Sequence, residues 1–322
     1  MLFRSNPSTI FSIGYAGSKN GRLNFTGKVN AARSASPNGT PAATIDALKL
    51  IPWSSPAWNY SSSTGYSNYN ALLLQFQKRF SNSLSTIASY TWSKCMDNSS
   101  GLFSAENGTG GGSVVQNYFD PQNAYGVCSY NIPNYLTWST NYSLPFGHGQ
   151  RWFNRGVTSY VFGGIRMNYV FQMRSGQPYN LTVGGDPANI SGNNGTVSGY
   201  SRPDMIGNPN SGGCGSVGIG QKSASGYCLF NPLAFSIPSA SFGNMGRGVL
   251  STPRYNNLDF SLIKVTPIHD QIQLELRAEA FNLYNAQILG APGTTVGTTS
   301  AGFSTGLAST PRQLQMAAKI TF

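Results

Sequence analysis

The chain ends on the stretch QLQMAAKITF, residues 313–322, in which apolar and polar side chains alternate up to the last position. The apolar parity comprises Leu314, Met316, Ala318, Ile320 and Phe322, and the polar parity comprises Gln313, Gln315, Ala317, Lys319 and Thr321. Chain ends are usually frayed and polar, because nothing holds them in place. Strict alternation is typical of a strand with one apolar face. The stretch therefore predicts that the last residue is held in a sheet.

Seven further stretches show the same alternation, and no stretch has the spacing of a long amphipathic helix. They are residues 9–17, 69–80, 84–94, 134–145, 160–174, 256–264 and 272–281. Their polar parity consists mainly of Ser, Thr, Gln and Asn. The longest, YVFGGIRMNYVFQMR, is expected to continue past Pro178 through YNLTV, residues 179–183. The sequence therefore predicts an all-β chain of about eight strands.

The links between these stretches alternate between short and long. The short links are about residues 81–83, 146–157 and 266–269, and the long links are about residues 19–65, 96–132, 185–253 and 286–310. In an antiparallel meander, such alternation places every long loop at one end of the sheet and every short turn at the other. This asymmetry is typical of transmembrane β-barrels.

Two architectures fit alternating strands. A transmembrane barrel turns its apolar parity to lipid and its polar parity to an aqueous lumen, and its closed sheet leaves no unpaired backbone in the membrane. A soluble β-sandwich turns the apolar parity inward and exposes the other parity, which is then usually charged. The small uncharged polar residues favour the barrel. Aromatic residues that fit interfacial girdles are Tyr90, Trp92, Trp138, Tyr142 and Tyr169.

The composition excludes some classes of protein. Charged residues make up 10% of the chain, against roughly 25% in an average globular domain. The net charge of +11 reflects scarce acidic residues, and the basic residues are scattered singly, so we expect no nucleic-acid partner. No apolar run reaches the roughly 18 residues of a transmembrane helix. Residues 1–15 contain no signal-peptide core, so a natural exported form is expected to begin upstream.

Four segments together resemble the C-terminal barrel of Oar-like TonB-dependent outer-membrane receptors. They are SNYNALLLQFQKRFSNSLSTIASYTWSKCMDNSS (67–100), SGQPYNLTV (175–183), STPRYNNLDFSLIKVTPIHDQIQLELRAEAFNLYNAQILGAP (251–292) and PRQLQMAAKITF (311–322). The resemblance covers about residues 11–322. It implies a terminal aromatic residue, here Phe322, that presents the last strand to the barrel assembly machinery.

Members of that family are much longer than this chain. They carry a signal peptide, often a small carboxypeptidase-regulatory-like domain, a TonB box, a plug domain, and a barrel of about 22 strands. Residues 1–322 are therefore expected to be a single β-barrel domain fragment that forms the last third of a larger barrel. The alternative is a complete eight-stranded barrel with a structural role, because a barrel of that size fills its lumen with side chains.

The four cysteines, Cys95, Cys128, Cys214 and Cys228, lie in or beside long links that the topology places outside the cell. That compartment permits disulfides, and sequence order favours Cys95 with Cys128 and Cys214 with Cys228, with the other pairings left open. A zinc site is the alternative, although no CxxC motif or nearby histidine supports it. His148 and His269 are expected in periplasmic turns, without a paired nucleophile.

Charged residues on the polar parity are the candidates for a functional surface. They are Arg166, Arg174, Asp259, Glu275, Arg277, Glu279 and Lys319. A tight turn at 266–269 would bring Asp259 opposite Arg277, a cross-strand pair worth at most about 1 kcal/mol. Such a surface could receive a plug or a passing solute, and internal salt bridging explains it equally well.

The resemblance implies a transporter of the bacterial outer membrane, in contact with outer-membrane lipid and, in the full-length protein, with TonB. The external ligand is unknown, and siderophores, oligosaccharides and peptides stay open. Long loops rich in Gly, Asn, Ser and Tyr suit recognition of a polar ligand, and flexible filler explains them equally well. A secreted or surface adhesin built as a soluble β-domain is the alternative from another class. We expect no cofactor and no enzymatic activity.

Overall fold

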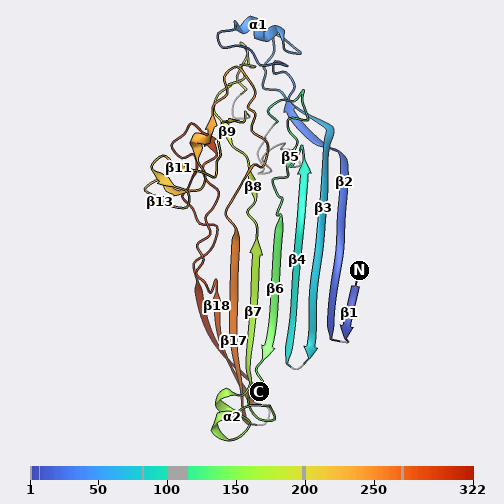
Figure 1. Ribbon diagram of the computed structural model, residues 1–322, viewed down its shortest axis with the longest axis vertical. Helices are drawn as coiled ribbons and strands as arrows, with labels where there is room; N and C mark the ends of the chain where they lie inside the picture. Colours follow the sequence, from blue (N-terminus) through green and yellow to red (C-terminus); the bar gives the residue numbers. More distant parts are fainter. Residues whose placement is uncertain (1, 7, 82, 101–114, 198–200, 270–271) are drawn as a thin grey trace.

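The computed structural model describes residues 2–6, 8–81, 83–100, 115–197, 201–269 and 272–322. It is built on one tall antiparallel sheet, with folded loops above it and short turns below (Figure 1). The strands run in chain order across the sheet: β1 (Leu2–Asn6), β2 (Thr9–Lys28), β3 (Asn59–Ser81), β4 (Leu84–Asp97), β6 (Asn134–Ser143), β7 (Ile165–Arg174), β17 (Tyr255–His269), β18 (Ile272–Phe281) and β21 (Gln313–Thr321). A short strand, β5 (Gly126–Val127), pairs with the outer end of β4.

Each of the eight stretches predicted from alternation contains a strand of this sheet. The strands β2 and β3 run farther outward than the alternation indicates, so the loop between them spans residues 29–58. No sequence pattern indicates β1, which pairs with the start of β2 and is too short to show a period. The meander and the assignment of its strands are therefore confirmed, with two added strands, β1 and the short β5.

The fifth predicted strand is wrong at its beginning. Residues 160–162 belong to helix α2 (Gly156–Phe162), and β7 begins only at Ile165. The break lies at Gly164, whose φ of +67° is a left-handed conformation that turns the chain and that glycine adopts without strain. Two adjacent glycines inside an alternating stretch thus end one element and start another.

The predicted continuation through residues 179–183 is also wrong, because the chain leaves the main sheet after β7. Proline has no backbone N–H to donate to a ladder, so Pro178 disfavours a continued central strand. The chain forms two isolated pairs among the loops instead: β8 (Pro178–Tyr179) with β16 (Leu250–Ser251), and β9 (Thr182–Val183) with β19 (Thr295–Val296).

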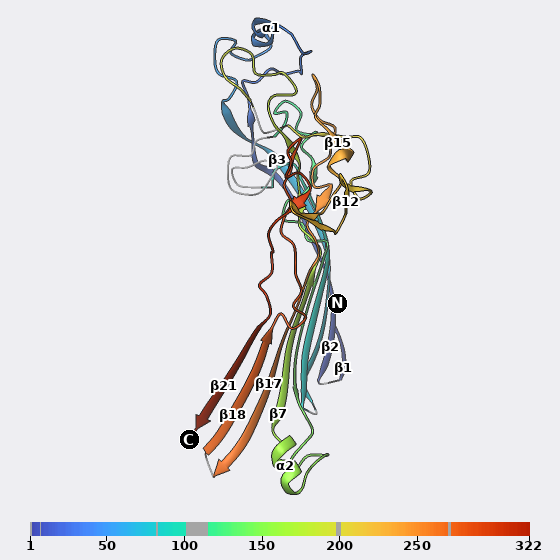
Figure 2. The same ribbon diagram turned by 90° about the vertical axis from the view of Figure 1, so that its left-hand side faces the viewer.

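All long loops lie at one end of the sheet and the short turns lie at the other, as predicted (Figure 1). The sheet is open within the described residues, since β1 and β21 form its two edges and lie apart (Figures 1 and 2). The sheet of the described residues does not close, so the alternative of a complete eight-stranded barrel is not observed, and the larger barrel expected from the sequence stays a prediction.

The register sorts the two parities onto two continuous faces. One row across five strands joins the polar residues Gln75, Ser89, Thr137, Gln172 and Asn257. The neighbouring parity joins a row of mostly apolar residues: Phe76, Ala88, Trp138, Phe171 and Leu258. We name these surfaces the polar face and the apolar face of the sheet.

The apolar face is not covered by a second layer in the described part of the chain. Exposed fractions reach 42% at Trp138, 46% at Leu276 and 87% at Met316. The three clusters of buried apolar residues lie at the outer end of the molecule, among the loops and the outer end of β2. A β-sandwich would bury this face, so the sandwich alternative is not observed.

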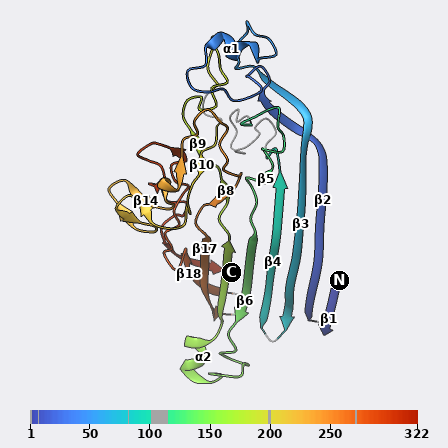
Figure 3. The same ribbon diagram turned by 45° about the horizontal axis from the view of Figure 1, so that its top comes forward.

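The long loops fold into an outer cap with its own cores (Figure 3). Its largest core centres on Leu181, Phe230 and Met245. The cap also contains small elements: α1 (Ala42–Ala47), β10 (Asp204–Met205), β11 (Gly213–Cys214), β12 (Val217–Gly218), β13 (Lys222–Ser223), β14 (Gly226–Cys228), η1 (Pro232–Ala234), β15 (Phe235–Ser236) and β20 (Phe303–Ser304). Parts of the Gly-rich loops, residues 101–114 and 198–200, lie outside the described residues. The described parts are packed and hydrogen-bonded, which flexible filler would not be.

No helix in the described residues combines the length and the apolar character needed to cross a membrane.

Candidate functional site

The structure places all seven predicted charged residues on the polar face. They are Arg166 and Arg174 on β7, Asp259 on β17, Glu275, Arg277 and Glu279 on β18, and Lys319 on β21. The strand register brings several of them level with one another. Glu275 is opposite Lys319, and Ile263 is opposite Arg166 on one side and Arg277 on the other. We call these seven residues the charged wall.

In the middle of the strands, charge on the polar face is concentrated in one half of the sheet. The corresponding parity of β6 is Tyr135, Thr137, Ser139, Asn141 and Ser143, and the middle of β4 carries Ser85, Ile87, Ser89, Thr91 and Ser93 on it. Four adjacent strands thus carry the charged wall beside strands whose middle is uncharged. This asymmetry distinguishes the wall from charge scattered to keep a surface soluble.

The predicted pair of Asp259 with Arg277 is wrong. Arg277 lies opposite Ile263, because β17 extends to His269 and the turn comes later in the chain than the sequence indicated. Asp259 instead accepts hydrogen bonds from the Asn257 side chain at 3.0 Å and from the backbone N–H of Asn282 at 2.9 Å. Asp259 therefore fixes the chain where it leaves β18.

Glu275 is the centre of an ion-pair network within the wall. Its Oε1 accepts a hydrogen bond from Arg277 Nη2 at 2.6 Å, and its Oε2 lies 3.7 Å from Arg166 Nη2. Arg277 Nη1 is also 3.8 Å from Glu279 Oε1. The side chains of Arg166 and Arg277 remain 49% and 41% exposed. Ion pairs this exposed contribute little to folding stability, so the network orders the charges more than it stabilises the sheet.

Arg174 closes the outer end of the wall. Its guanidinium carbon lies 4.9 Å from the centroid of the Tyr255 ring, its ladder neighbour on β17. A cation over an aromatic face gains about 0.5–1 kcal/mol at an exposed site. The position of Arg174 is thereby fixed without a carboxylate partner being needed.

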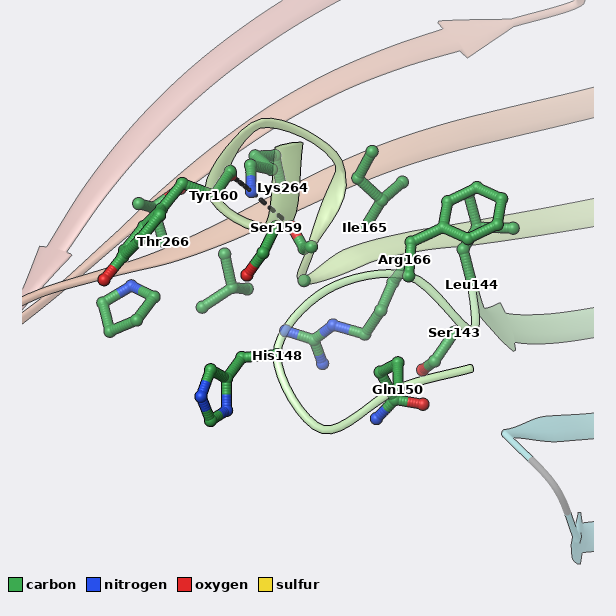
Figure 4. A pocket seen from close by; sticks show the side chains of 15 residues that line it. Ser143, Leu144, His148, Gln150, Ser159, Tyr160, Ile165, Arg166, Lys264 and Thr266 are labelled. Carbon is green, nitrogen blue, oxygen red and sulfur yellow. Dashed lines mark hydrogen bonds between the residues drawn. The ribbon is translucent and has the colours of Figure 1, made fainter. Parts of the chain in front are cut away.

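A cavity of about 650 Å³ opens at the lower end of the wall, where the chain links β6 to β7. Arg166 reaches into it from β7, and His148, Gln150 and Ser143 lie around the same opening (Figure 4). The opposite side carries Lys264, whose Nζ donates to the backbone oxygen of Tyr160 at 2.6 Å (Figure 4). This cavity was not predicted, because residues 160–164 were expected to extend a strand.

The two histidines lie where the sequence placed them, at the lower end of the sheet. His269 ends β17, and His148 is in the link between β6 and β7. The cavity around His148 contains hydroxyl, amide and cationic groups, and its described lining has no carboxylate that would orient the imidazole as a base. The lining is therefore suited to binding anionic or polar groups.

The cysteines form two disulfides, in the pairing that sequence order favours. Cys95 at the outer end of β4 is joined to Cys128, with a Cα–Cα distance of 5.4 Å, and Cys214 is joined to Cys228, with a distance of 5.8 Å. Asp97 lies close to Cys95 and Cys128 in a group that resembles a metal site. Because both sulfurs are used in the disulfide, neither is available as a thiolate ligand.

Removing the second disulfide is expected to loosen the cap. A Cys214→Ser/Cys228→Ser double variant opens a closed loop whose ends are 14 residues apart, which should cost about 3 kcal/mol in the chain-entropy model. Limited proteolysis of the folded protein should then cleave within residues 201–231, while the sheet stays protected. Unchanged resistance of that segment would show that the cap core holds it without the disulfide.

Two buried arginines in the cap have no counterpart among the predicted sites. Arg247 Nη1 lies 3.0 Å from Asp97 Oδ1, with both side chains fully buried, and it also donates to the backbone oxygen of Ala124 at 2.8 Å. Arg202 donates to the backbone oxygens of Met245 and Asn123 at 2.7 and 2.8 Å. Together they tie the end of β4 to the two loops that follow β4 and β7.

A third charged contact joins the first long loop to the third. Asp46 Oδ1 lies 2.6 Å from Lys49 Nζ, and the Asn193 side chain donates to Asp46 Oδ2 at 2.8 Å. The hydrogen bond from the Lys49 ammonium holds the pKa of the Asp46 carboxyl below its ordinary value. Asp46 therefore stays ionised, and keeps both loops together, at any pH above the ordinary range for aspartate.

Comparisons with known proteins show the family to which this chain belongs. A family model described as "outer membrane beta barrel domain" matches residues 4–315. The crystal structure of the outer membrane transporter YddB from Escherichia coli is similar to this chain with a TM-score of 0.44 and 11% sequence identity, over 98% of this chain and 31% of that chain. A search of curated proteins found no match. The chain therefore belongs to the outer membrane beta barrel domain family and is located in the bacterial outer membrane.

Proposed function

We propose that the chain is the C-terminal part of the barrel of an Oar-like TonB-dependent transporter, which takes up a scarce or bulky substrate such as a siderophore, an oligosaccharide or a peptide. The observation that carries the proposal is the open sheet with an uncovered apolar face. In a membrane an open edge leaves backbone groups without partners, so further strands must close the barrel. Barrels of about 22 strands, such as outer-membrane transporters, enclose a plugged lumen.

The charged wall is the surface against which a plug domain would dock. Arg166 and Arg277 are half-exposed while Glu275 holds them in place, so their remaining N–H groups are available to a second surface. The cavity beside Arg166 opens at the same lower end, where a plug would be pulled by TonB. The role is that of a transporter wall, and we infer no enzymatic activity.

The terminal strand supports the assembly role proposed for Phe322. β21 is an edge of the sheet, and the Phe322 side chain is 93% exposed. An edge strand presents unpaired backbone groups that another chain can pair with. Phe322 and this edge are therefore positioned for recognition by the barrel assembly machinery.

The direct test of the proposed function is the genomic sequence upstream of Met1. An in-frame plug domain and signal peptide would support it. The proposal would be contradicted if the protein is expressed and functional from Met1 while a stop codon and an unrelated gene lie directly upstream. An adhesin is not favoured, because the apolar face would then be left in water.

Neutralising the wall is expected to loosen the plug of the full-length protein. A Glu275→Gln/Arg277→Gln variant replaces both charges by neutral amides and removes the ion pair at the centre of the network. Cells that carry it should become several-fold more sensitive to a bulky antibiotic that the intact outer membrane excludes. Ser139→Ala, on the uncharged half of the same face, is the matched control and should not change sensitivity. Equal sensitivity in both variants would show that the wall does not hold a plug.

A further inference from the structure

The short helix α2 carries its apolar side chains outward. Val157, Tyr160 and Val161, at positions i, i+3 and i+4, are 78%, 67% and 54% exposed, whereas the small polar Ser159 is buried. A surface helix of a soluble domain turns such a stripe toward the core and its polar residues toward water. The helix therefore has the opposite arrangement to a helix on an aqueous surface, with its apolar side chains exposed and a polar one buried.

The residues that lead into α2 extend this exposed apolar surface. Trp152 and Phe153 are 55% and 47% exposed. The Phe153 ring contacts the rings of Phe146 and Phe162 with centroid distances of 5.3 and 5.0 Å. The backbone N–H of Gly147 donates to the backbone oxygen of Trp152 at 3.0 Å. These contacts hold the link in one shape, so its apolar surface is a feature of the fold.

The charge of this link is entirely positive. Residues 144–164 contain Arg151 and Arg155 and have no aspartate or glutamate. The guanidinium carbon of Arg151 lies 5.7 Å from the centroid of the Trp152 ring, so cation and aromatic group form one surface. Apolar and aromatic side chains together with arginine are typical of helices that lie in the interface of an anionic membrane.

The link also continues the apolar face of the sheet. Lys264 occupies an apolar-face position of β17 level with the lower end of β7, and its Nζ donates to the backbone oxygens of Tyr160 and Gly163 at the end of α2. A lysine at the end of a membrane strand places its charge at the lipid–water boundary. The end of α2 is therefore attached where the apolar face meets that boundary.

We propose that residues 151–162 are an interfacial anchor that lies in the periplasmic leaflet of the outer membrane, with Trp152, Val157 and Val161 among the acyl chains and Arg151 and Arg155 at anionic phospholipid headgroups. Short turns of outer-membrane barrels lie on the periplasmic side, and α2 is at that end of the sheet (Figure 2). The anchor fixes the depth of the barrel wall in the membrane. It requires the outer-membrane location of the chain and does not depend on transport.

The anchor is tested by lipid quenching of fluorophores attached to single cysteines. The protein is extracted from bacterial outer membranes and reconstituted in nanodiscs of brominated phosphatidylcholine with phosphatidylglycerol. The variants V157C and V161C carry the label on the apolar stripe, and T158C carries it on the same helix away from the stripe. The native cysteines of the protein are paired in disulfides and do not react. L276C, on the apolar face of β18, reports on the sheet itself.

Labels at 157 and 161 should be quenched about as strongly as the label at 276, and several-fold more than the label at 158. Quenching at 276 with no difference among 157, 158 and 161 would overturn the anchor and leave the membrane face of the sheet intact. In V157C, the added changes R151Q and R155Q should reduce quenching in discs with phosphatidylglycerol and have little effect in discs without it. An equal effect in both discs would overturn the role given to the headgroups.

Discussion

Replacing Arg247 by methionine is expected to unfold the outer cap while the sheet stays folded. The variant leaves the fully buried carboxylate of Asp97 without its cation, and removing one partner of a buried ion pair costs about 3–5 kcal/mol. The loss should be local, because Arg247 joins cap loops to the last residue of β4, at the outer end of the sheet. Limited proteolysis should cut the cap of the variant at urea concentrations at which the wild-type cap is intact.

The control for this prediction is the double variant Asp97→Asn/Arg247→Met. It removes the uncompensated charge along with the pair, so the cap should recover part of the lost stability. If the Arg247→Met variant loses less than about 1 kcal/mol of cap stability, which is the value of an exposed ion pair, water reaches this contact. The double variant would then behave no better than the single one.

Phe171→Arg is expected to impair membrane insertion, whereas Gln172→Arg should be tolerated. The two residues are neighbours on β7 and lie on the apolar and the polar face. An arginine at the lipid-facing midplane of a barrel costs about 2–4 kcal/mol, and the same residue facing the lumen costs little. The measurements are the yield of folded protein in outer membranes and the urea midpoint in lipid vesicles. Equal losses for the two variants would mean that both faces have the same surroundings.

Alternation was sufficient to predict the strands and their faces because a sheet places successive side chains on opposite sides. The C-terminal strand, β18 and the continuous polar face follow from this rule alone. It failed where glycine interrupted the pattern: the run from Tyr160 to Phe162 keeps the parity of a strand, but Gly163 and Gly164 separate it from β7. A pair of adjacent glycines within an alternating run is the local signal that would have indicated the break.

Register and the cap were beyond the sequence for other reasons. A shift of the turn between β17 and β18 moves every cross-strand partner, so Asp259 and Arg277 do not meet although both lie on the predicted face. The pairs of two-residue strands in the cap are too short for any period to appear. Arg202 and Arg247 both lie in the long loop between β7 and β17, and only the folded cap shows that they are buried.

The central claim is that the apolar face meets lipid and the polar face meets water. Spin labels placed singly at each residue from Ile272 to Phe281 in the membrane-embedded protein test it most directly. Even positions should be accessible to lipid-soluble oxygen and odd positions to a water-soluble nickel complex, with the two profiles out of phase along the strand. Profiles in phase, or reversed, would contradict the claim and the transport role that rests on it.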